Sequence, residues 1–208
     1  MKIGIIGAGK IGGTLARLFA EAGHEVAISN SRGPDTLVEL VDEIGHGVQA
    51  MTVADAAAFG DIVVVSVPLH AYREIPAQQT AGKIVVDTNN YYPSRDGQIA
   101  ELDDDSTTST ELLQAHLPDS RVVKAFNAIM WKHLSNDGRP PGDPGRLGIP
   151  ISGDDEDAKR TVSELIDQIG FDPIDAGTLA EGGRRHQSGA PGYTMGTRTP
   201  ELRSLLGV

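Results

Sequence analysis

The stretch that decides the fold stands at the start of the chain: Lys2-Ile3-Gly4-Ile5-Ile6-Gly7-Ala8-Gly9-Lys10-Ile11-Gly12. Residues 2–6 predict a short strand, and residues 10–22 carry apolar side chains at helical spacing. The glycines between them follow the G-x-G-x-x-G pattern of a turn whose backbone N–H groups and helix dipole bind a pyrophosphate. Gly7 permits the tight turn, Gly9 lets the backbone approach the ligand, and Gly12 allows close helix–strand packing. The expected cofactor-binding residues here are Gly7, Ala8, Gly9, Lys10, Ile11 and Gly12.

Strands and helices alternate along the rest of the chain. A strand at 24–28, a helix at 35–44 and a strand at 48–52 complete a βαβαβ unit. The β-branched run at 62–67 is typical of a strand buried on both faces of a parallel sheet. Further strands are expected at 83–87, 121–125, 149–152 and 171–175, and further helices at 55–59, 71–79, after a capping box at 108–111, and at 154–169. This alternation predicts an α/β protein with a Rossmann-type, doubly wound, mostly parallel sheet and a short C-terminal extension.

The residues after the second strand indicate which dinucleotide is preferred. An acidic residue about 20 positions beyond the glycines would bind the ribose hydroxyls of NAD. This chain has Ser29-Asn30-Ser31-Arg32 there instead. An amide, a hydroxyl and a guanidinium can bind a 2′-phosphate through charge-assisted hydrogen bonds, so we expect NADP(H), with Asn30, Ser31 and Arg32 as contacts. We expect residues 1–120 to form the NADP-binding Rossmann domain, and residues 121–208 an α/β extension and glycine-rich tail continuous with the same sheet.

Composition excludes several classes of function. The 208 residues include 18 Lys and Arg against 29 Asp and Glu, a net charge of −11, which would repel nucleic acid and anionic membranes. Cysteine is absent, which excludes disulfides, thiolate catalysis and sulfur-ligated metal sites. The six His residues show no paired metal spacing, and we expect no metal site. With no signal peptide and no apolar run of about 18 residues, we expect a cytoplasmic protein.

Other candidate contacts follow later strands, at the sheet edge where ligands of such folds bind. The segment Val67-Pro68-Leu69 ends the buried run, Asn89 follows the fifth strand and Asn127 the sixth. We expect these residues to contact the nicotinamide and a small-molecule acceptor. His70 is a further site candidate, with a helix-start cap as the alternative.

No catalytic side chain is predicted. No Tyr has a Lys four positions later, so the Tyr-x-x-x-Lys pair that donates a proton to a carbonyl oxygen is missing. Hydride transfer between two stacked ring cofactors needs orientation and a dry pocket rather than an acid–base pair, and it is therefore the favoured reaction.

With these segments in view, the chain resembles the NADP-dependent coenzyme F420 (deazaflavin) reductases. It is also similar to the oxidoreductase domain of the six-transmembrane metalloreductases, which passes hydride to a flavin. The resemblance is carried by residues 7–12, 30–32, 67–68, 122–127, 153–155 and 175–177. It implies a homodimer with NADP on the first βαβ unit, contacted by residues 8–11, Ser31 and Arg32. It also implies that the deazaflavin or flavin ring stacks on the nicotinamide near Pro68 and Asn127.

Two other functions stay open at this point. One is an NADPH-dependent reductase of a small carbonyl or imine, although the roughly 30 residues after the last expected strand are too few for the helical domain of such enzymes. The other is a non-catalytic NADPH-binding sensor. We expect the acidic stretch 101–105 to be a solvated loop. Glycine and proline punctuate residues 177–208 too often for a long helix, which predicts a packed loop or a mobile arm.

Overall fold

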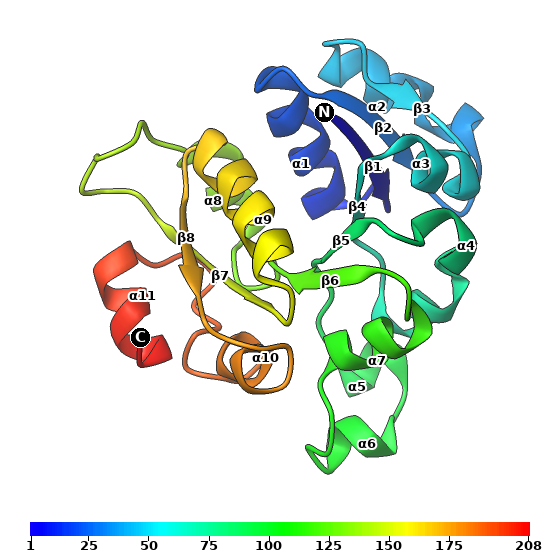
Figure 1. Ribbon diagram of the computed structural model, residues 1–208. Coiled ribbons are helices and arrows are strands. Elements are labelled where there is room, and N and C mark those ends of the chain that lie inside the picture. Colours follow the sequence, from blue (N-terminus) through cyan, green and yellow to red (C-terminus); the bar gives the residue numbers. More distant parts are fainter.

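The computed structural model describes all residues from 1 to 208, and eight strands form one sheet in the order β3-β2-β1-β4-β5-β6-β7-β8 (Figure 1). Every neighbouring pair is parallel except β6 with β7, and the chain moves outward in both directions from the β1–β4 boundary. The doubly wound, mostly parallel α/β fold is therefore confirmed. The strands are β1 (Lys2–Ile6), β2 (Glu25–Ser29), β3 (Gln49–Ala50), β4 (Ile62–Val65), β5 (Ile84–Asp87), β6 (Arg121–Lys124), β7 (Gly148–Gly153) and β8 (Asp172–Asp175).

Eleven α-helices and two 3-10 helices connect the strands and follow the last one. The α-helices are α1 (Lys10–Glu21), α2 (Val38–Ile44), α3 (Val53–Phe59), α4 (Ala77–Thr80), α5 (Pro93–Asp96), α6 (Ala100–Asp103), α7 (Ser109–His116), α8 (Trp131–Asn136), α9 (Glu156–Gln168), α10 (Glu181–His186) and α11 (Thr199–Leu206). The 3-10 helices are η1 (Pro34–Leu37) and η2 (Leu69–Glu74). No helix has the length and apolarity needed to span a membrane.

Side chains of the central strands alternate between two cores, one on each face of the sheet. Val64 and Val86 pack with residues of α1, α2, α8 and α9. Val63 and Val85, the neighbours that point the other way, pack with residues of α3, η2 and α7. Successive side chains of a strand point to opposite faces of the sheet, and here both faces are covered by helices. Every side chain of a central strand is therefore buried, which explains the continuous β-branched sequence of β4.

Several helices differ from the sequence-based expectation. The helix expected at 35–44 begins as η1, because Pro34 stands at its first position, and becomes α-helical at Val38. The helix expected at 71–79 divides at Pro76 into η2 and α4. The acidic stretch expected as a loop contains one exposed helical turn, α6. The capping box is confirmed: Thr108 and Glu111 satisfy each other's backbone N–H groups at the start of α7.

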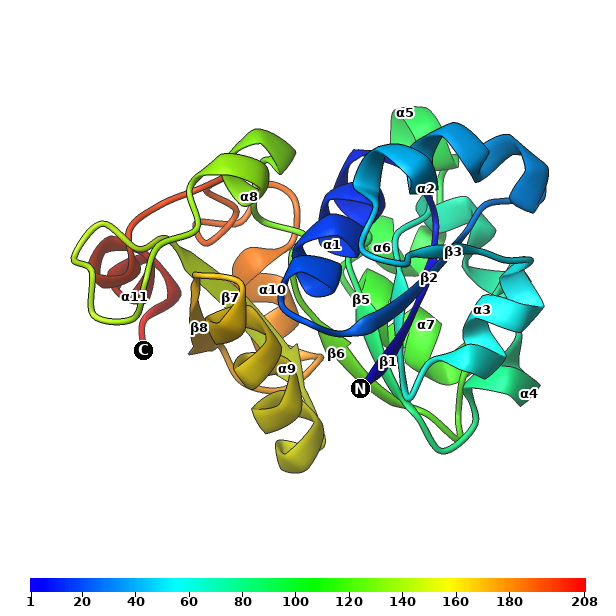
Figure 2. The ribbon, with the colours of Figure 1, turned by 90° about the horizontal axis from the view of Figure 1, so that it is seen from above.

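The tail is ordered and packed, not a mobile arm. Strands β7 and β8 and helices α9 to α11 lie together beside the rest of the molecule (Figure 2). Leu202 and Leu206 of α11 pack on Ile174 and Ala176. Between these helices the tail hydrogen bonds to the chain near α8 and β7, through the Met130 N–H to the Met195 carbonyl and the Gly148 N–H to the Thr197 carbonyl.

The glycines of β1 and α1 make opposite demands on packing, which gives a test of the fold. A Cβ on Gly4 would lie 1.9 Å from the Ala56 carbonyl oxygen of α3, so we expect Gly4→Ala to destabilise the protein by about 2–3 kcal/mol. A Cβ on Gly13 would make only ordinary contact with Leu40, at 3.9 Å, so Gly13→Ala should stabilise by about 0.5–1 kcal/mol. Urea unfolding followed by circular dichroism measures both, and equal effects of the two substitutions would contradict this packing.

Candidate functional site

A cavity of about 1130 Å³ opens at the carboxyl edge of the sheet, above β1, β2 and β4. The turn after β1, the turn after β2 and the segment from the end of β4 through η2 form its walls. The lining residues are Ile6, Gly7, Ala8, Gly9, Asn30, Ser31, Arg32, Thr36, Leu37, Leu40, Val53, Ser66, Val67, Pro68, His70, Ala71, Glu74 and Ile75. A cavity of this size at the β1–β4 boundary, where the strand order reverses, is the expected binding place of a doubly wound sheet.

The three glycines of the first turn are needed for different reasons. Gly7 has a φ of +113°, and a Cβ there would lie 2.0 Å from the Ser66 carbonyl oxygen. A Cβ on Gly12 would lie 1.9 Å from the Gly7 carbonyl oxygen, so both are required by the fold itself. Gly9 has an ordinary φ of −77°, and a Cβ there would meet no protein atom within 4 Å. Neither conformation nor packing explains Gly9, whereas a ligand lying against the backbone would.

The start of α1 adds unpaired backbone donors to this turn. Gly9 is the N-cap of a twelve-residue helix and provides no side-chain cap, and the first turn contains no acidic residue. The N–H groups of the first turn therefore face outward with the positive end of the helix dipole, an arrangement that binds phosphate.

In the turn after β2, the Asn30 amide stabilises the turn and the Arg32 guanidinium has no partner. The Asn30 side chain accepts from the Arg32 N–H at 2.9 Å and donates to the Thr36 hydroxyl at 2.8 Å, which fixes the turn. The exposed Arg32 guanidinium makes no hydrogen bond or ion pair within the protein. It lines the cavity beside Ser31 and is available to an anionic ligand.

Eight of the fourteen residues predicted from sequence line this cavity: Gly7, Ala8, Gly9, Asn30, Ser31, Arg32, Val67 and Pro68. The structure places the other six behind or beside it. Leu69 is buried in the core, and Gly12 and Ile11 belong to the packed start of α1. The Lys10 ammonium lies over the Trp131 ring of α8, 4.9 Å from its centroid. Asn89 and Asn127 lie in a polar network at the ends of β5 and β6, described next.

A buried ion pair joins the carboxyl ends of β5 and β6. The Lys124 ammonium is 3.7 Å from an Asp87 carboxylate oxygen and donates to the Asn89 carbonyl at 2.9 Å and the Thr110 hydroxyl at 2.9 Å. Burial lowers the pKa of Lys124, and the Asp87 carboxylate opposes that effect. Since removing one partner would leave an unpaired buried charge, this pair fixes the loops beyond both strands.

A second network ties the tail to the same edge. Asn127 donates to the His186 carbonyl at 2.7 Å and to the Asn90 side chain at 3.1 Å, so its Oδ1 must face His186 Nδ1, 2.9 Å away. Nδ1 therefore carries the proton, and His186 Nε2 accepts from the Ser152 hydroxyl at 2.6 Å. Burial, with Lys124 nearby, holds the pKa of His186 well below its usual range.

The Ser152–His186–Asn127 arrangement has the connectivity of a nucleophile, base and orienting group. Its members are only 0%, 0% and 4% exposed, so no substrate reaches the hydroxyl in this structure. The neutral imidazole instead anchors α10 to the loop after β6.

One acid–base pair stands at the rim of the cavity. His70 Nδ1 is 3.2 Å from an Asp96 carboxylate oxygen, and His70 Nε2 has no protein partner. Burial raises the pKa of Asp96, but hydrogen bonds from Arg95 and from the Tyr92 and His70 N–H groups outweigh it and hold that pKa at about 2. The carboxylate therefore stays ionised and orients the imidazole.

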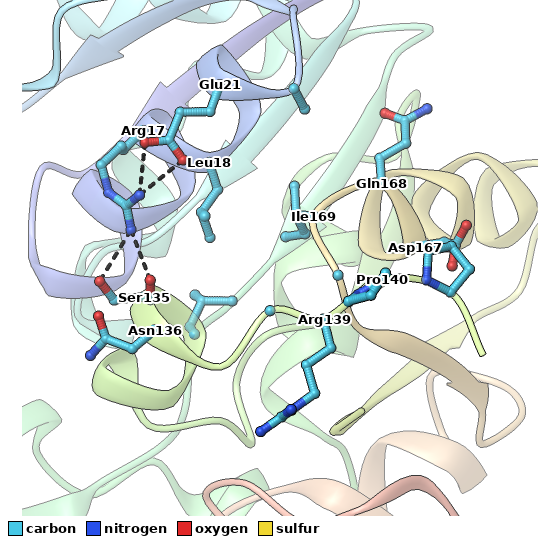
Figure 3. A pocket seen from close by; sticks show the side chains of 15 residues that line it. Arg17, Leu18, Glu21, Ser135, Asn136, Arg139, Pro140, Asp167, Gln168 and Ile169 are labelled. Carbon is cyan, nitrogen blue, oxygen red and sulfur yellow. Dashed lines mark hydrogen bonds and ion pairs between the residues drawn. The ribbon is translucent and has the colours of Figure 1, made fainter. Parts of the chain in front are cut away.

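A second cavity, of about 450 Å³, lies at the other end of α1 (Figure 3). At one side of it Arg17 hydrogen bonds to Glu21, one turn further along α1, at 2.9 Å and to the Ser135 carbonyl at 3.1 Å (Figure 3). Arg17 and Glu21 therefore have partners within the protein, and none of the predicted cofactor-binding residues lines this cavity. The larger cavity is therefore the candidate site.

The family follows from comparison with known proteins. A family model described as NADP oxidoreductase, coenzyme F420-dependent, matches residues 2–91. The F420-dependent NADP reductase of Methanothermobacter thermautotrophicus is 30% identical over 194 residues, which cover 86% of this chain and 82% of that protein. The chain belongs to this family. The resemblance predicted from the sequence is therefore confirmed.

Two further proteins are similar to this chain. A crystal structure of a putative F420-dependent NADP-reductase from Arthrobacter sp. matches with a TM-score of 0.74 and 31% identity, covering 86% of each chain. The metalloreductase STEAP3 of Rattus norvegicus is 32% identical over 181 residues, or 86% of this chain. The chain spans about a third (34%) of the length of that metalloreductase.

The residues that line the larger cavity fit NADP(H). A Cβ on Gly9 would meet no protein atom within 4 Å, so the backbone there and the first turn of α1 suit a diphosphate. The free Arg32 guanidinium suits a 2′-phosphate. Sequence reasoning missed the walls contributed by η1, α2, α3 and η2, including Thr36, Val53 and Glu74. Their position directly after β2, β3 and β4 was the available signal, but the sequence of residues 71–79 predicted an ordinary helix and not a wall of the cavity.

The geometry of the first turn predicts that substitution of Gly9 impairs NADPH binding, whereas substitution of Gly12 impairs folding. Gly9→Val should leave stability unchanged but weaken NADPH binding at least about 100-fold, equivalent to about 2.7 kcal/mol, because its side chain would fill the diphosphate space. Gly12→Val should instead destabilise the fold. Quenching of the single tryptophan, Trp131, which lies against Lys10, reports binding. Tight NADPH binding by Gly9→Val would contradict this assignment.

The Asp96 carboxylate predicts a pH-dependent stability difference. Its pKa falls from an ordinary 3.8 to about 2 in the folded protein, so ionisation stabilises the fold above pH 4, and this contribution is lost as the pH falls to 2. After screening by solvent at the rim, Asp96→Asn should cost about 1–2 kcal/mol at pH 7 and almost nothing at pH 2. Urea unfolding across this range measures it. The control is Asp157→Asn, which changes an exposed carboxylate of α9. A pH-independent loss for Asp96→Asn would rule out the linkage.

Proposed function

We propose that the protein transfers hydride between NADP(H) and a deazaflavin of the coenzyme F420 type. The observation that carries the proposal is the similarity to an F420-dependent NADP reductase over 82% of that protein's length, with the glycine turn and Arg32 placed on one cavity. NADPH, when bound, supplies the hydride.

The residues of this chain would bind and orient the two rings. The turn after β1 holds the diphosphate and Arg32 the 2′-phosphate, which leaves the nicotinamide half to cross toward β4 and β5. At that edge Asp87 is paired with Lys124, and Asn127 is hydrogen bonded to His186. They form a rigid wall that sets distance and angle between the rings, which is the contribution that ring-to-ring transfer requires.

A flavin is the second candidate acceptor, because its ring system has the shape of a deazaflavin and the resemblance to the metalloreductases implies it. A small carbonyl is the third, and one observation favours it. His70, oriented by Asp96 and with Nε2 free at the cavity, has the geometry of a general acid, which reduction of a carbonyl needs and ring-to-ring transfer does not.

Anaerobic oxidation of NADPH, followed by absorbance, separates these acceptors. We expect rapid oxidation with coenzyme F420 and slower or no oxidation with FMN, FAD or a panel of small aldehydes and ketones. Activity with carbonyls alone, abolished by His70→Gln, would replace the proposal with a carbonyl reductase. Tight NADPH binding without oxidation by any acceptor would instead support a sensor.

Cofactor choice can be tested at Arg32. Arg32→Ala should weaken NADPH binding by about 1.5–3 kcal/mol and leave NADH binding unchanged, because only NADPH carries the phosphate that the guanidinium meets. Arg203→Ala, an exposed arginine of α11, removes the same charge far from the cavity and serves as the control. Tryptophan quenching with both cofactors measures the difference, and equal losses for NADPH and NADH would remove the 2′-phosphate assignment.

A further inference from the structure

His186 is the one buried histidine among the six of the chain. It is the last residue of α10 and comes directly before residues 187–198, the segment between α10 and α11 that we call the strap. The proposed hydride transfer needs no proton from this imidazole. A titratable ring enclosed at the start of a connecting segment therefore calls for an explanation of its own.

Both ring nitrogens of His186 have uncharged partners. Nδ1 donates to the Asn127 side chain at 2.9 Å, and Nε2 accepts from the Ser152 hydroxyl at 2.6 Å. A proton on Nε2 would turn that acceptor into a donor, and the Ser152 hydroxyl would have to reverse its bond. Ser152 has no other hydrogen-bond partner for its side chain, so the hydroxyl proton would then be buried without an acceptor.

The charged groups around the ring do not compensate for a positive imidazole. No carboxylate hydrogen bonds to His186, and the Asp87 carboxylate of β5 is already paired with the Lys124 ammonium of β6. Burial, and then the positive charge of Lys124, lower the pKa of His186 well below its usual range. Two arginines of α10 add further positive charge: Arg184, which lies 3.9 Å from Glu111 of α7, and Arg185, which donates to a backbone carbonyl.

The strap holds the loops after β5 and β6 together through a small number of contacts. The Tyr193 hydroxyl bonds to the Tyr92 hydroxyl, and the Met195 carbonyl accepts from the Met130 N–H at 2.8 Å. Met195 has a φ of +62°, a conformation that is unfavourable for a residue with a side chain and persists only where its surroundings enforce it. The closed strap therefore depends on its anchors, and His186 is the anchor at its first end.

We infer that the strap opens when His186 is protonated: the imidazolium leaves Ser152 and Asn127, and residues 187–198 separate from the loops after β5 and β6. The closed form takes only the neutral ring, whereas the open form exposes the ring to water, where it accepts a proton from solvent. The edge of the sheet at β5 and β6 is thus closed at neutral pH and opens in mild acid. This regulation goes beyond the proposed function and does not depend on it.

Hydrogen exchange of the wild-type protein, followed by mass spectrometry, tests the opening. A group whose pKa is lowered in the closed form favours closure above its ordinary pKa of 6.5, and this contribution is lost as the pH falls below that value. The opening constant should rise about tenfold for each pH unit below 6.5, or about 30-fold between pH 7.5 and pH 5.

The readout is the protection of peptides that cover residues 187–198, corrected for the intrinsic exchange rate at each pH. It should fall about 30-fold over this range, while peptides of β1 and β4 keep their protection. Equal protection of the strap at both pH values, or a strap without protection at pH 7.5, would overturn the inference.

Two histidine variants assign the response to one ring. His186→Gln keeps a polar side chain beside Ser152 but cannot titrate, so protection of the strap should become independent of pH. His133→Gln is the matched control, because a Cβ on Gly196 of the strap would lie 2.9 Å from the His133 ring, and His133 is half-exposed. This control should keep the full response. A response that is lost in His133→Gln would overturn the role of His186, and that comparison decides even if His186→Gln does not fold.

Discussion

The close approach of three backbone segments at the end of β1 is the constraint on which the site depends. A side chain at Gly7 would strike the Ser66 carbonyl, and one at Gly12 would strike the Gly7 carbonyl. Because both residues are glycine, α1 can start directly above β1 and beside β4, and the N–H groups of its first turn face the cavity. Any larger residue would push the helix away from the strands and remove the anion-binding geometry.

The edge of the sheet beside the cavity, at the ends of β5 and β6, depends on buried polar groups rather than on close packing. The Lys124–Asp87 pair fixes the loop after β5, and the Asn127–His186–Ser152 chain fastens the tail to the loop after β6. In addition, the Tyr92 and Tyr193 hydroxyls hydrogen bond to each other, and burial raises the pKa of Tyr193. The tail thus helps to build the edge where the acceptor would bind. Removing it would expose Leu202 and Leu206 and their core partners as well as opening the edge.

Local patterns in the sequence were enough to predict the sheet and the first turn. Periodicity located seven strands closely and β3 as a longer strand than the structure has, and the G-x-G-x-x-G pattern placed Gly7 and Gly9 on the cavity. Contacts between residues that are far apart in the sequence could not be predicted. Nothing near Asn127 in the sequence indicates that His186, 59 positions later, occupies its amide, and nothing near His70 indicates Asp96. The helices α5, α6, α8, α10 and α11 were missed, because four to eight residues give too little periodicity. The cofactor contacts residue by residue, the division of the chain at residue 120 and the homodimer stay predictions.

Direct hydride transfer between the two rings can be followed with an isotopic label on the nicotinamide. NADPH carrying deuterium at both C4 positions of the nicotinamide would be oxidised anaerobically with coenzyme F420, and the reduced deazaflavin analysed by mass spectrometry. Transfer between rings held in contact predicts that each reduced molecule carries one deuterium at carbon, where it does not exchange with solvent. Reduced deazaflavin with no deuterium, or oxidation of NADPH with no reduced deazaflavin, would contradict the account.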